Sequence, residues 1–522
     1  MTNIYEQIVK KLNRDKIANR QALDWKIRQL SSGFKIAPPE KIKLLSAYHK
    51  LLVLKTLKKN QNLENLLKKR EIRTLSGVAP IAVLTKPFPC PGQCIFCPSQ
   101  KKMPKSYLAN EPAVMRAILC KFDPFKQVAM RLRALKMTGH ETDKCELIIM
   151  GGTWSYLPKN YQTKFIKRCF DAFNGKIAKN LEQAQQWNEK AKFRVIGLTL
   201  ETRPDYITPA EIKRMRELGA TRVELGVQSL DDKVLKLNRR GHLVKQTIMA
   251  TKLLKEAGFK ISYHMMPNLP GATPASDLKM FKKLFKDQNF QPDMLKIYPC
   301  VITKDAKISK WYKQGKYKPY SAKQLFNLII KIKKGIPPYV RISRLIRDIP
   351  IESIVAGNKI SNLRQLIQNQ QGLICQCIRC REARNKQFTI NNLQLTSRKY
   401  KASGGTEYFL SYESKDQKIL YAFLRLRIPA KQEQSISLNI PELKNAALLR
   451  ELHTYGQLIP LTKTKQHAVQ HLGLGKKLIQ EAEKITKQQG FKKIAVISGI
   501  GVRQYYKNLG YKLTGSYMIK TL

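Results

Sequence analysis

Long hydrophobic runs are missing from this sequence. No apolar stretch reaches the length needed to span a membrane, and Met1 to Asp15 is polar and charged, without the apolar core of a signal peptide. Internal repeats and low-complexity linkers are also missing. These absences predict a soluble, cytoplasmic protein that does not span or partner a membrane. Because 522 residues are too many for one ordinary core, we expect about two to four packed domains.

Acidic residues are scarce. Asp and Glu number 37 against 97 Lys and Arg, which gives a formal net charge of +60. Such a field favours a polyanionic partner, with nucleic acid ahead of an anionic membrane surface. The alternative is a lysine-rich proteome in which most of this charge is simply solvated. The net charge therefore indicates a class of binding partner but does not identify the reaction.

Cysteines are sparse as well, ten in all. That number is too small for a secreted protein held together by disulfides. Six of them fall in two short clusters, at residues 90–97 and 375–380, a pattern typical of metal ligation in a reducing compartment. The other four are expected to be ordinary buried residues: Cys120, Cys145, Cys169 and Cys300.

The first part of the chain, residues 1–75, has a helical pattern. Leu44, Tyr48, Leu51 and Leu52 form an apolar stripe at helical spacing, and Lys or Arg fill the gaps. Residues 1–70 contain 17 basic and 5 acidic residues. We expect a basic helical region that contacts nucleic acid, although an amphipathic subdomain packed on the next domain fits nearly as well.

Residues 76–365 alternate between strand and helix patterns, which predicts a parallel sheet, either open or a partial barrel. Active sites of parallel βα barrels lie at the carboxyl ends of the strands. Polar or glycine-rich segments follow several of the predicted strands, so we expect the site at that end. The strands are predicted at 145–150, 193–200, 221–227, 260–265, 294–298 and 339–343.

The remaining chain divides into a short segment and a domain. Residues 366–392 carry the second cysteine cluster and form a linker, and residues 393–522 are expected to fold as a compact α+β domain. Strands are predicted there at 408–412, 419–427 and 493–498, and helices at 473–486 and 503–509.

The first cysteine cluster has the spacing C-x3-C-x2-C, with Cys90, Cys94 and Cys97. Three thiolates at this spacing can ligate three irons of a 4Fe–4S cluster and leave the fourth iron open to S-adenosylmethionine. Phe96, directly before the last cysteine, also suits the radical S-adenosylmethionine pattern. A structural zinc loop is the alternative, but no fourth Cys or His lies nearby.

Three further groups lie at or just after the ends of predicted strands. Gly151, Gly152 and Thr153 resemble the glycine motif that holds the methionine moiety of the cofactor in that superfamily. Glu201 and Gln228 are predicted to bind polar groups of cofactor or substrate. His264 is a candidate for proton handling, and a satisfied core histidine is the open alternative.

A second motif lies near the C-terminus, where Gln470, Gly473, Leu474 and Gly475 open a predicted helix with the pattern Q-x-x-G-x-G. Backbone N–H groups and the helix dipole favour a pyrophosphate at such a start. The pattern resembles the acetyl-CoA loop of GNAT-family acetyltransferases.

A tyrosine pair, Tyr505 and Tyr506, follows that motif and the strand after it. In a GNAT fold a tyrosine at this place can protonate the departing CoA thiolate. A pair of core aromatic residues is the alternative for either tyrosine.

The two motifs together resemble one family, the catalytic third subunit of the Elongator complex with its single-chain bacterial and archaeal relatives. The resemblance runs from about residue 76 to the C-terminus. Asn268 departs from it, since many relatives have Asp there, and the x3 spacing of the first cluster is the shorter form. The motifs that carry the resemblance include NEP at 110–112, MRA at 115–117, GGT at 151–153, ETRPDY at 201–206, GVQS at 226–229, NRRGH at 238–242, HMMP at 264–267 and RELH at 450–453.

The resemblance implies an α/β multidomain fold, with a partial (β/α) radical S-adenosylmethionine barrel followed by a GNAT domain. It implies a zinc held by Cys375, Cys377 and Cys380 between the catalytic domains, with a distant His or Cys as fourth ligand. It also carries acetyl-CoA contacts over onto this chain: Lys144, Glu451, Leu452, His453, Thr454, Gly473, Leu474, Gly475 and Tyr505 or Tyr506.

The activity implied is formation of 5-carboxymethyluridine at the wobble uridine of tRNA. The adenosyl radical would take hydrogen from the acetyl methyl of acetyl-CoA, the carbon radical would add to the uracil ring, and thioester hydrolysis would leave the product. The partners would be tRNA, acetyl-CoA and an electron donor, and whether the enzyme is a homo-oligomer stays open. Two alternatives are a protein lysine N-acetyltransferase with a structural iron–sulfur cluster, and a non-enzymatic tRNA-binding component with acetyl-CoA as a sensed ligand.

Overall fold

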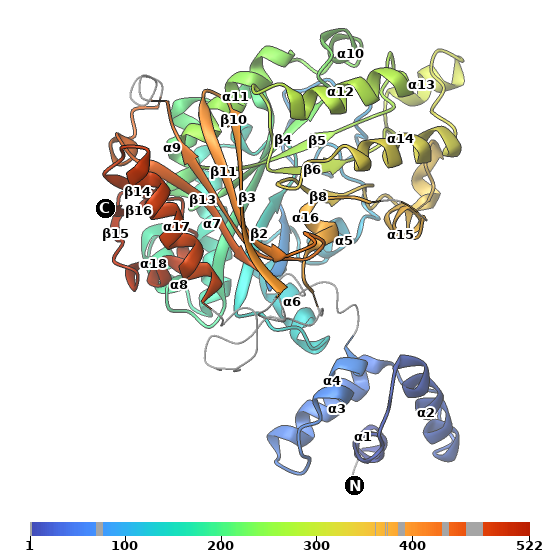
Figure 1. Ribbon diagram of the computed structural model, residues 1–522. Coiled ribbons are helices and arrows are strands. Elements are labelled where there is room, and N and C mark those ends of the chain that lie inside the picture. Colours follow the sequence, from blue (N-terminus) through green and yellow to red (C-terminus); the bar gives the residue numbers. More distant parts are fainter. Residues whose placement is uncertain are drawn as a thin grey trace.

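The computed structural model describes residues 3–68, 77–360, 362–370, 372, 374–384, 392–430, 438–455 and 473–522. The helical prediction for the first part is confirmed over its described residues, where four helices surround a small apolar core of their own. This helical unit lies apart from the rest in Figure 1. Its helices are α1 (Ile4–Arg14), α2 (Arg20–Gly33), α3 (Lys41–Val53) and α4 (Gln61–Leu67).

Asparagine caps fix where three of these helices begin. Asn3, Asn19 and Asn60 each accept a hydrogen bond from a backbone N–H in the first turn that follows, at 3.0 Å in all three cases. Such a bond satisfies one of the four N–H groups that a helix start leaves without a partner. The polar residues between the apolar stripes therefore define the helix boundaries.

Seven parallel strands form a curled sheet in the centre of the molecule (Figure 1). The six predicted strands are confirmed to within two residues at each end, and a seventh, β1, was not predicted. In sheet order they are β1 (Ala79–Leu84), β2 (Lys144–Met150), β3 (Arg194–Thr202), β4 (Arg222–Gln228), β5 (Lys260–Met265), β6 (Met294–Ile297) and β8 (Arg341–Arg344).

Helices connect successive strands, as a parallel sheet requires. The sheet order follows the chain order, and β1 and β8 form the two edges. A short antiparallel pair, β7 (Ile302–Thr303) with β9 (Ile354–Ala356), lies beside it. The helices of this part are α5 (Pro112–Leu119), α6 (Pro124–Met137), α7 (Lys159–Asn174), α8 (Leu181–Asn188), α9 (Pro209–Glu217), α10 (Asp232–Leu237), α11 (Val244–Glu256), α12 (Pro274–Lys286), α13 (Ile308–Lys313), α14 (Ala322–Lys334), α15 (Leu363–Gln368) and α16 (Ile378–Arg381).

A second seven-stranded sheet follows, with helix α17 (Leu474–Gln488) packed on it and the short α18 (Arg503–Lys507) after it. The predicted strands and helices of this part are confirmed, while β10, β13, β15 and β16 were not predicted. In sheet order the strands are β10 (Leu393–Ala402), β11 (Gly405–Ser414), β12 (Leu420–Ile428), β13 (Ala447–Thr454), β14 (Lys493–Val496), β16 (Tyr517–Thr521) and β15 (Lys512–Thr514).

One pairing in this sheet differs from the others. Strands β13 and β14 run parallel, and their register covers only Ala447 to Leu449 against Ile494 to Val496. The other neighbours in the sheet are antiparallel. Strand β13 thus continues to Thr454 without a partner in β14.

The second sheet packs against the amino ends of the barrel strands. The Tyr517 hydroxyl donates to the carbonyl of Ala257, just before β5, at 2.9 Å. A Cβ on Gly499 would lie 2.1 Å from the Ile196 carbonyl oxygen near the start of β3, so only glycine fits this contact. One hydrophobic core runs through both sheets. The two sheets therefore form one packed body.

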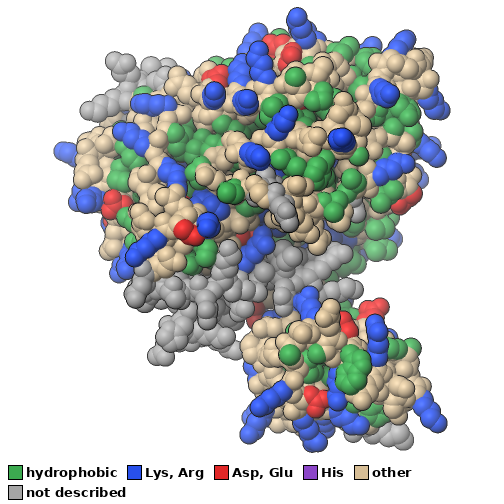
Figure 2. All heavy atoms as spheres, turned by 45° about the vertical axis from the view of Figure 1, so that its right-hand side comes forward, with side chains coloured by type: hydrophobic (Ala, Val, Ile, Leu, Met, Phe, Trp, Pro, Cys, Tyr) green, Lys and Arg blue, Asp and Glu red, His purple; other side chains and the backbone are tan. Residues whose placement is uncertain are grey.

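The surface carries the charge that the composition predicts. Figure 2 shows Lys and Arg side chains spread over the visible face, with few Asp and Glu between them. No helix in the described part of the chain is both long enough and apolar enough to cross a membrane.

Candidate active site

A cavity of about 740 Å³ lies on the inner side of the curled sheet. Its walls come from all seven strands of this sheet, β1 to β6 and β8, and from the loops after them. It brings together the sequence-predicted residues of the first half of the chain, which are Cys90, Cys94, Cys97, Gly152, Thr153, Glu201, Gln228 and His264. Gly151 precedes Gly152 at the end of β2.

The three cysteines sit on a loop after β1, where donors point at the sulfurs. The backbone N–H of Gly92 donates to Cys90 Sγ at 3.4 Å, and Arg240 Nη1 donates to Cys94 Sγ at 3.5 Å. A hydrogen bond from Cys97, helped by the charge of Arg240, lowers the pKa of the Cys94 thiol to about 5, although burial opposes this. The same bond and burial raise the pKa of the Cys97 thiol. Within this pair Cys94 thus favours the thiolate, the form that ligates iron.

The loop also has room and unmatched donors for a bound group. A Cβ on Gly92 would lie 3.6 Å from both Cys90 Sγ and Cys94 Sγ and 2.4 Å from Arg203 Nη1, so a side chain there would fill the space between sulfurs and guanidinium. Arg203 Nη1 is buried and has no hydrogen-bond partner among the described residues. Thiolates, a cationic donor and a glycine cradle together fit an anionic iron–sulfur cluster.

The glycine motif lies beside this loop. Gly151 and Gly152 have φ angles of +135° and +104°, which favour glycine, and a Cβ on Gly151 would lie 2.0 Å from Thr85 Oγ1. Thr153 Oγ1 is 4.0 Å from Cys90 Sγ. The end of β2 therefore presents backbone and a hydroxyl to the edge of the cysteine loop.

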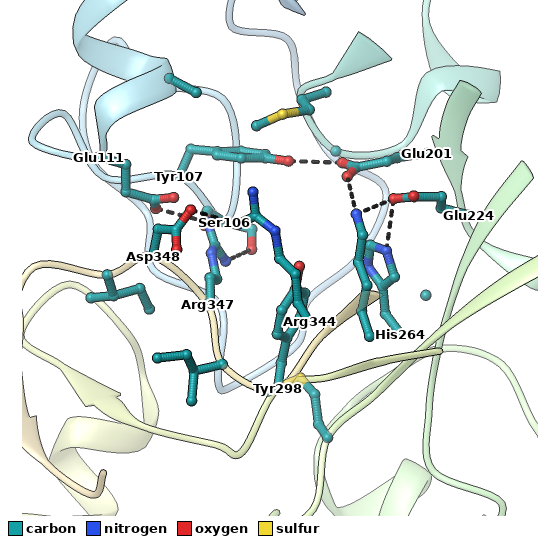
Figure 3. Close-up of a pocket in the computed structure, with 18 of the residues that line it drawn as sticks. Ser106, Tyr107, Glu111, Glu201, Glu224, His264, Tyr298, Arg344, Arg347 and Asp348 are labelled. Carbon is teal, nitrogen blue, oxygen red and sulfur yellow. Dashed lines mark hydrogen bonds and ion pairs between the residues drawn. The ribbon is translucent and has the colours of Figure 1, made fainter. Parts of the chain in front are cut away.

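A polar cluster occupies the middle of the cavity (Figure 3). Lys296 lies between two carboxylates: it donates to Glu224 and is 3.7 Å from Glu201. His264 Nε2 is 3.0 Å from the same Glu224 oxygen. Burial pulls the pKa of Lys296 down, but the charges of Glu224, Tyr298 and Glu201 outweigh it and raise that pKa. Lys296 is thus a charged donor at neutral pH.

Gln228, the predicted ligand at the end of β4, is held in an unusual backbone conformation. Its φ is +71°, which is uncommon for a residue other than glycine. Its side-chain oxygen is buried and has no donor among the residues that the structure describes. An acceptor placed this way inside a cavity suits an N–H group of a ligand.

Several cavity residues were not predicted from the sequence. Tyr107 donates to Glu201 at 2.7 Å, and Arg347 pairs with Glu111 at 2.8 Å. Arg344 pairs with Asp348 at 2.6 Å where both are well exposed, and Figure 3 shows its side chain reaching into the cavity. Arg222, Glu224 and Gln228 alternate with apolar residues along β4, a period of two that could have indicated one wall of the cavity but not which side chains meet Glu224 there.

The predicted acetyl-CoA residues divide into groups. Gly473 has a φ of +71° and caps the start of α17. A Cβ on Gly475 would lie 3.1 Å from the hydroxyl oxygen of Tyr505. It would also lie 3.7 Å from a side-chain atom of Leu452 and 3.8 Å from one of Thr454. Glycine, tyrosine and one face of β13 thus converge. Leu474 follows as the first, buried residue of α17. Gln470, with residues 471 and 472, lies outside the described residues.

Glu451 and His453 belong to the other face of β13, because side chains alternate along a strand. Glu451 accepts from Arg425 at 2.8 Å and is 3.6 Å from Lys260 at the start of β5. The ring of His453 lies 4.4 Å from that of Tyr455. These two residues therefore face the barrel and not Gly475.

Lys144 is placed elsewhere again. It is the first residue of β2, with Arg194 as its register partner, at the strand end that the second sheet covers. Burial lowers the pKa of Lys144.

The two tyrosines have different surroundings. Tyr505 is 40% exposed, whereas Tyr506 is 6% exposed and its ring lies between those of Tyr505 and Tyr511. Burial raises the pKa of Tyr506 far above its ordinary value. Tyr505 is thus the tyrosine that a bound ligand can reach, and Tyr506 is a packing residue.

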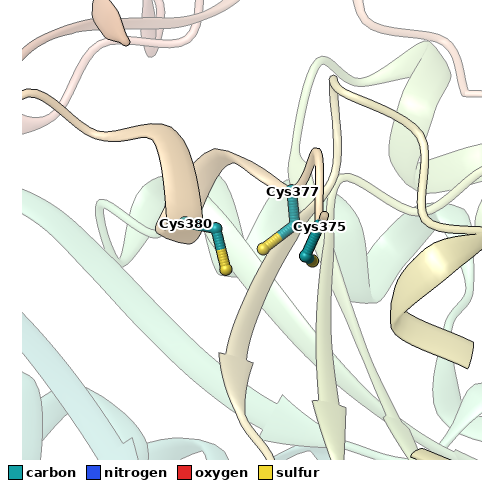
Figure 4. A group of neighbouring side chains, drawn as sticks. All are labelled: Cys375, Cys377 and Cys380. Atoms are coloured by element: carbon teal, nitrogen blue, oxygen red, sulfur yellow. The ribbon is translucent and has the colours of Figure 1, made fainter. Parts of the chain in front are cut away.

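The second cysteine cluster forms a compact group (Figure 4). The sulfurs of Cys375, Cys377 and Cys380 all lie within 4.8 Å of one another, and Lys333 Nζ donates to Cys380 Sγ at 3.5 Å. This donor set fits a metal ion that prefers thiolates. In the described ranges no His, Asp, Glu or fourth Cys joins the group.

Known proteins resemble this chain over most of its length. Residues 89–284 match the radical SAM superfamily, and residues 292–371 match the radical SAM C-terminal domain. A "tRNA uridine(34) acetyltransferase" of Methanocaldococcus jannaschii is 48% identical, over 88% of this chain and 87% of that protein. Human "Elongator complex protein 3" is 38% identical, over 87% and 86%. The solved structure of archaeal Methanocaldococcus infernus Elp3 with an N-terminal deletion matches 85% of this chain and 99% of that chain, with a TM-score of 0.74 and 43% identity.

Proposed function

Because the chain belongs to the family of the tRNA uridine(34) acetyltransferases and Elongator complex protein 3, we propose that it modifies the wobble uridine of tRNA. It would be a radical S-adenosylmethionine acyltransferase that forms 5-carboxymethyluridine from acetyl-CoA. The observation that carries this proposal is the single cavity that holds the cysteine loop, the glycine motif and a charged polar cluster. A tRNA-modifying enzyme of this kind would work in the cytoplasm.

The cysteine loop is the proposed place of the 4Fe–4S cluster. Cys90, Cys94 and Cys97 would ligate it, and it would supply the electron that cleaves S-adenosylmethionine. Gly151, Gly152 and Thr153 lie beside the first sulfur and would hold the methionine end of that cosubstrate. The unmatched oxygen of Gln228 would accept from one of its N–H groups. An external one-electron donor would reduce the cluster.

The central polar cluster is the proposed place of reaction. Lys296 would donate to a carbonyl oxygen of uracil or thioester, because it is charged and buried beside Glu201 and Glu224. His264 bonds to Glu224 and would move protons as the ring is substituted.

The protein lysine N-acetyltransferase reading has no support. In that reading the cysteine loop would be structural and remote from any substrate. Here the loop lines the same cavity as Gly152, Thr153, Glu201, Gln228 and His264, and Arg240 donates to Cys94 Sγ. The other alternative, a non-enzymatic tRNA-binding component that senses acetyl-CoA, is distinguished from the enzyme by whether the protein modifies tRNA.

The decisive experiment follows the nucleoside. tRNA is incubated with reconstituted protein, S-adenosylmethionine, a reductant and acetyl-CoA labelled with ¹³C in the acetyl group, and digested for mass spectrometry. We expect labelled 5-carboxymethyluridine together with 5′-deoxyadenosine, and neither when S-adenosylmethionine is omitted. If reduced protein with an intact cluster makes no 5′-deoxyadenosine, the proposal of radical S-adenosylmethionine activity is wrong. A product without label would reject acetyl-CoA as the carbon source.

Tyr505 and Tyr506 provide a matched pair for the acetyl-CoA site. Tyr505→Phe should lower acetyl-CoA turnover about 10²-fold, the lower end of what a general acid contributes, since its hydroxyl faces Gly475. Tyr506→Phe should stay within a few-fold of the parent, because that ring is packed in the core. Release of free thiol is the measurement. Equal effects of the two substitutions would remove the role assigned to Tyr505.

The second cysteine cluster is proposed to hold a structural zinc. Three thiolates would bind it, and a fourth ligand from elsewhere would close the site. Cys377→Ser should therefore remove bound zinc and lower the thermal midpoint. Cys169→Ser, a matched change at another fully buried cysteine, should keep zinc unchanged. Metal analysis of both purified variants is the test, and equal zinc contents would contradict the proposal.

The helical unit is proposed to bind tRNA through its net positive charge. Its basic side chains outnumber its acidic ones about threefold, and it has a separate core, so the unit can present charge to a nucleic acid without disturbing the barrel. Binding through phosphates should weaken steeply with added salt. Whether two copies associate is left to measurement of molecular mass.

A further inference from the structure

The cysteine loop is a wall of the cavity, and its other side is held by two segments of the barrel. All three cysteines line the cavity on the inner side. On the other side, the Ile95 N–H donates to the Asn238 carbonyl at 3.2 Å, and the Ile95 carbonyl accepts from the Ile308 N–H at 2.8 Å. The Ser99 N–H donates to the Asp305 carbonyl at 3.0 Å. The residue after α10 and the start of α13 thus support the back of the loop.

This side of the loop lies close to the surface. Asn238 and Ile308 are buried, but their neighbours in the chain, Arg239 and Lys307, are exposed. Helices α10 and α13 share one small apolar core with Cys94. Neither helix contributes a residue to the lining of the cavity. A group held by the three cysteines would therefore lie a short way below an outer surface that is separate from the cavity.

The surface over these two segments is strongly basic. Residues 231–240 and 304–318 have a net charge of +7 in 25 residues, against +60 in 522 for the whole chain. The nearby acidic residues already accept hydrogen bonds: Asp305 from Gln100 at 2.7 Å, and Asp231 and Asp232 from backbone N–H groups at 2.8 Å. We call this surface the basic face, and its exposed cations are Lys236, Arg239, Lys304, Lys307 and Lys310.

An apolar side chain lies within the basic face. Leu237, the last residue of α10, is 44% exposed and stands between Lys236 and the segment that contacts the cysteine loop. Transient electron-transfer complexes bury little surface and form through charge attraction, so a patch of cations around an apolar residue suits such a partner.

The electron must reach the loop while the cavity is occupied. In the proposed reaction S-adenosylmethionine and the substrates lie on the inner side of the loop, so a reductant of protein size cannot approach from there. The basic face leads to the same loop from outside. Figure 1 also shows α10 and α13 at the end of the barrel away from the helical unit, the proposed tRNA-binding part. This position suits a protein reductant better than tRNA.

We propose that the basic face is the docking surface for a small acidic electron-transfer protein. This proposal rests on the proposed function. The partner carries an iron–sulfur or flavin group and is oxidised by one electron, and the group held by the cysteine loop is reduced by the same electron. No bond forms or breaks in this step. Leu237 would contact the partner at the centre, and the surrounding cations would attract its carboxylates.

Cross-linking tests the surface directly. The full-length reconstituted protein is mixed with an acidic ferredoxin that carries two 4Fe–4S clusters. A carbodiimide then joins lysine amines to carboxylates, and the joined peptides are identified by mass spectrometry. We expect Lys236, Lys307 and Lys310 to account for most of the joined lysines, and high salt to remove these products. Products spread evenly over lysines of other faces would overturn the proposal.

Charge reversal tests the same surface through the rate of electron delivery. The variant Lys236→Glu/Lys307→Glu/Lys310→Glu should make 5′-deoxyadenosine about tenfold or more slowly with reduced ferredoxin at low salt, since charge steering contributes at least that factor to association. Dithionite is a small reductant that needs no docking surface, so it should support the parental rate in this variant. The control reverses the same number of exposed lysines elsewhere on the barrel: Lys164→Glu, Lys190→Glu and Lys213→Glu.

The control variant should keep both rates. A parental rate with ferredoxin in the basic-face variant would overturn the proposal. An equal fall with dithionite would also overturn it, because the substitutions would then act on the cysteine loop itself. Loss of tRNA affinity with an unchanged ferredoxin rate would assign the basic face to nucleic acid instead. If the parent makes no 5′-deoxyadenosine even with dithionite, the proposed radical activity fails, and the cross-linked lysines still decide whether the basic face binds the ferredoxin.

Discussion

Replacing Cys94 by alanine should abolish 5′-deoxyadenosine and carboxymethyluridine formation while tRNA binding is retained. Cys94 is the most buried of the three loop cysteines, at 4% exposure, and the bond from Arg240 fixes its sulfur. Two remaining thiolates would hold a 4Fe–4S cluster poorly, so we expect activity to fall by more than about 10³-fold. Binding should persist because the helical unit has its own core and does not contain this loop.

Cys145→Ala is the matched control for this change. Cys145 is also fully buried, but it lies on β2, and its thiol donates to the Thr142 carbonyl at 3.1 Å, away from the cysteine loop. This variant should keep its iron and its activity. Iron per chain, the absorbance of the cluster, 5′-deoxyadenosine by mass spectrometry and tRNA binding are measured for both proteins. Full iron and turnover in Cys94→Ala would show that the cluster lies elsewhere.

Strands buried on both faces could be predicted because they form short apolar runs. Strand β5, at Lys260–Met265, has β-branched or aromatic residues between a helix end and a proline-containing loop, and its bounds were predicted without error. Strand β1 was missed because Pro80 lies within it. Its position at the sheet edge is what permits a residue without an N–H group.

The composition of the polar cluster could not be predicted from the sequence. Glu201, Glu224, His264 and Lys296 belong to four strands, and only the register between those strands brings them together. Such register depends on packing of the whole sheet and leaves no local signal. The strand-end rule found Glu201 and His264 but gave no reason to select Glu224 or Lys296, which lie within strands.

The division of the acetyl-CoA residues has a similar cause. Family resemblance assigned Glu451, Leu452, His453 and Thr454 as one group, but alternation along β13 sends them to two faces. Likewise, the spacing of Tyr505 and Tyr506 could not say which ring is buried. Helix α18 turns the second ring toward Tyr511 and leaves the first beside Gly475.

The buried ion pairs between the two sheets could not be predicted from the sequence either. They give the second prediction with a large expected effect. Asp293, just before β6, is fully buried and pairs with Arg450 of β13 at 2.6 Å. Arg425 and Lys255 lie 3.6 and 3.9 Å from the same carboxylate. Burial would raise the pKa of Asp293, but these three cations, with Arg450 first, outweigh it and lower that pKa. Removing this carboxylate would leave the three buried cations with Glu407 and Glu451 alone as acidic partners among the described residues.

Asp293→Asn should therefore destabilise the packed body by about 3–5 kcal/mol, the usual cost of breaking a buried ion pair from one side. Asp24→Asn is the matched control: its pair with Lys41, at 2.7 Å, leaves the Asp24 side chain 48% exposed. Such a pair is worth about 1 kcal/mol or less. Denaturant unfolding is followed by far-ultraviolet circular dichroism and by the fluorescence of the tryptophans in the barrel region, Trp154, Trp187 and Trp311.

The pH dependence separates this electrostatic cause from a general loss of packing. A carboxyl whose folded pKa lies below its unfolded value contributes its stability above the unfolded pKa, about 4 for Asp, and loses it as pH falls toward the folded pKa. The difference in unfolding free energy between the parent and Asp293→Asn should thus be constant from pH 8 to about 5 and shrink below about 4. A difference that does not change down to pH 3 would assign the loss to altered packing. A loss no larger than that of Asp24→Asn would show that Glu407 and Glu451 compensate the buried cations without Asp293.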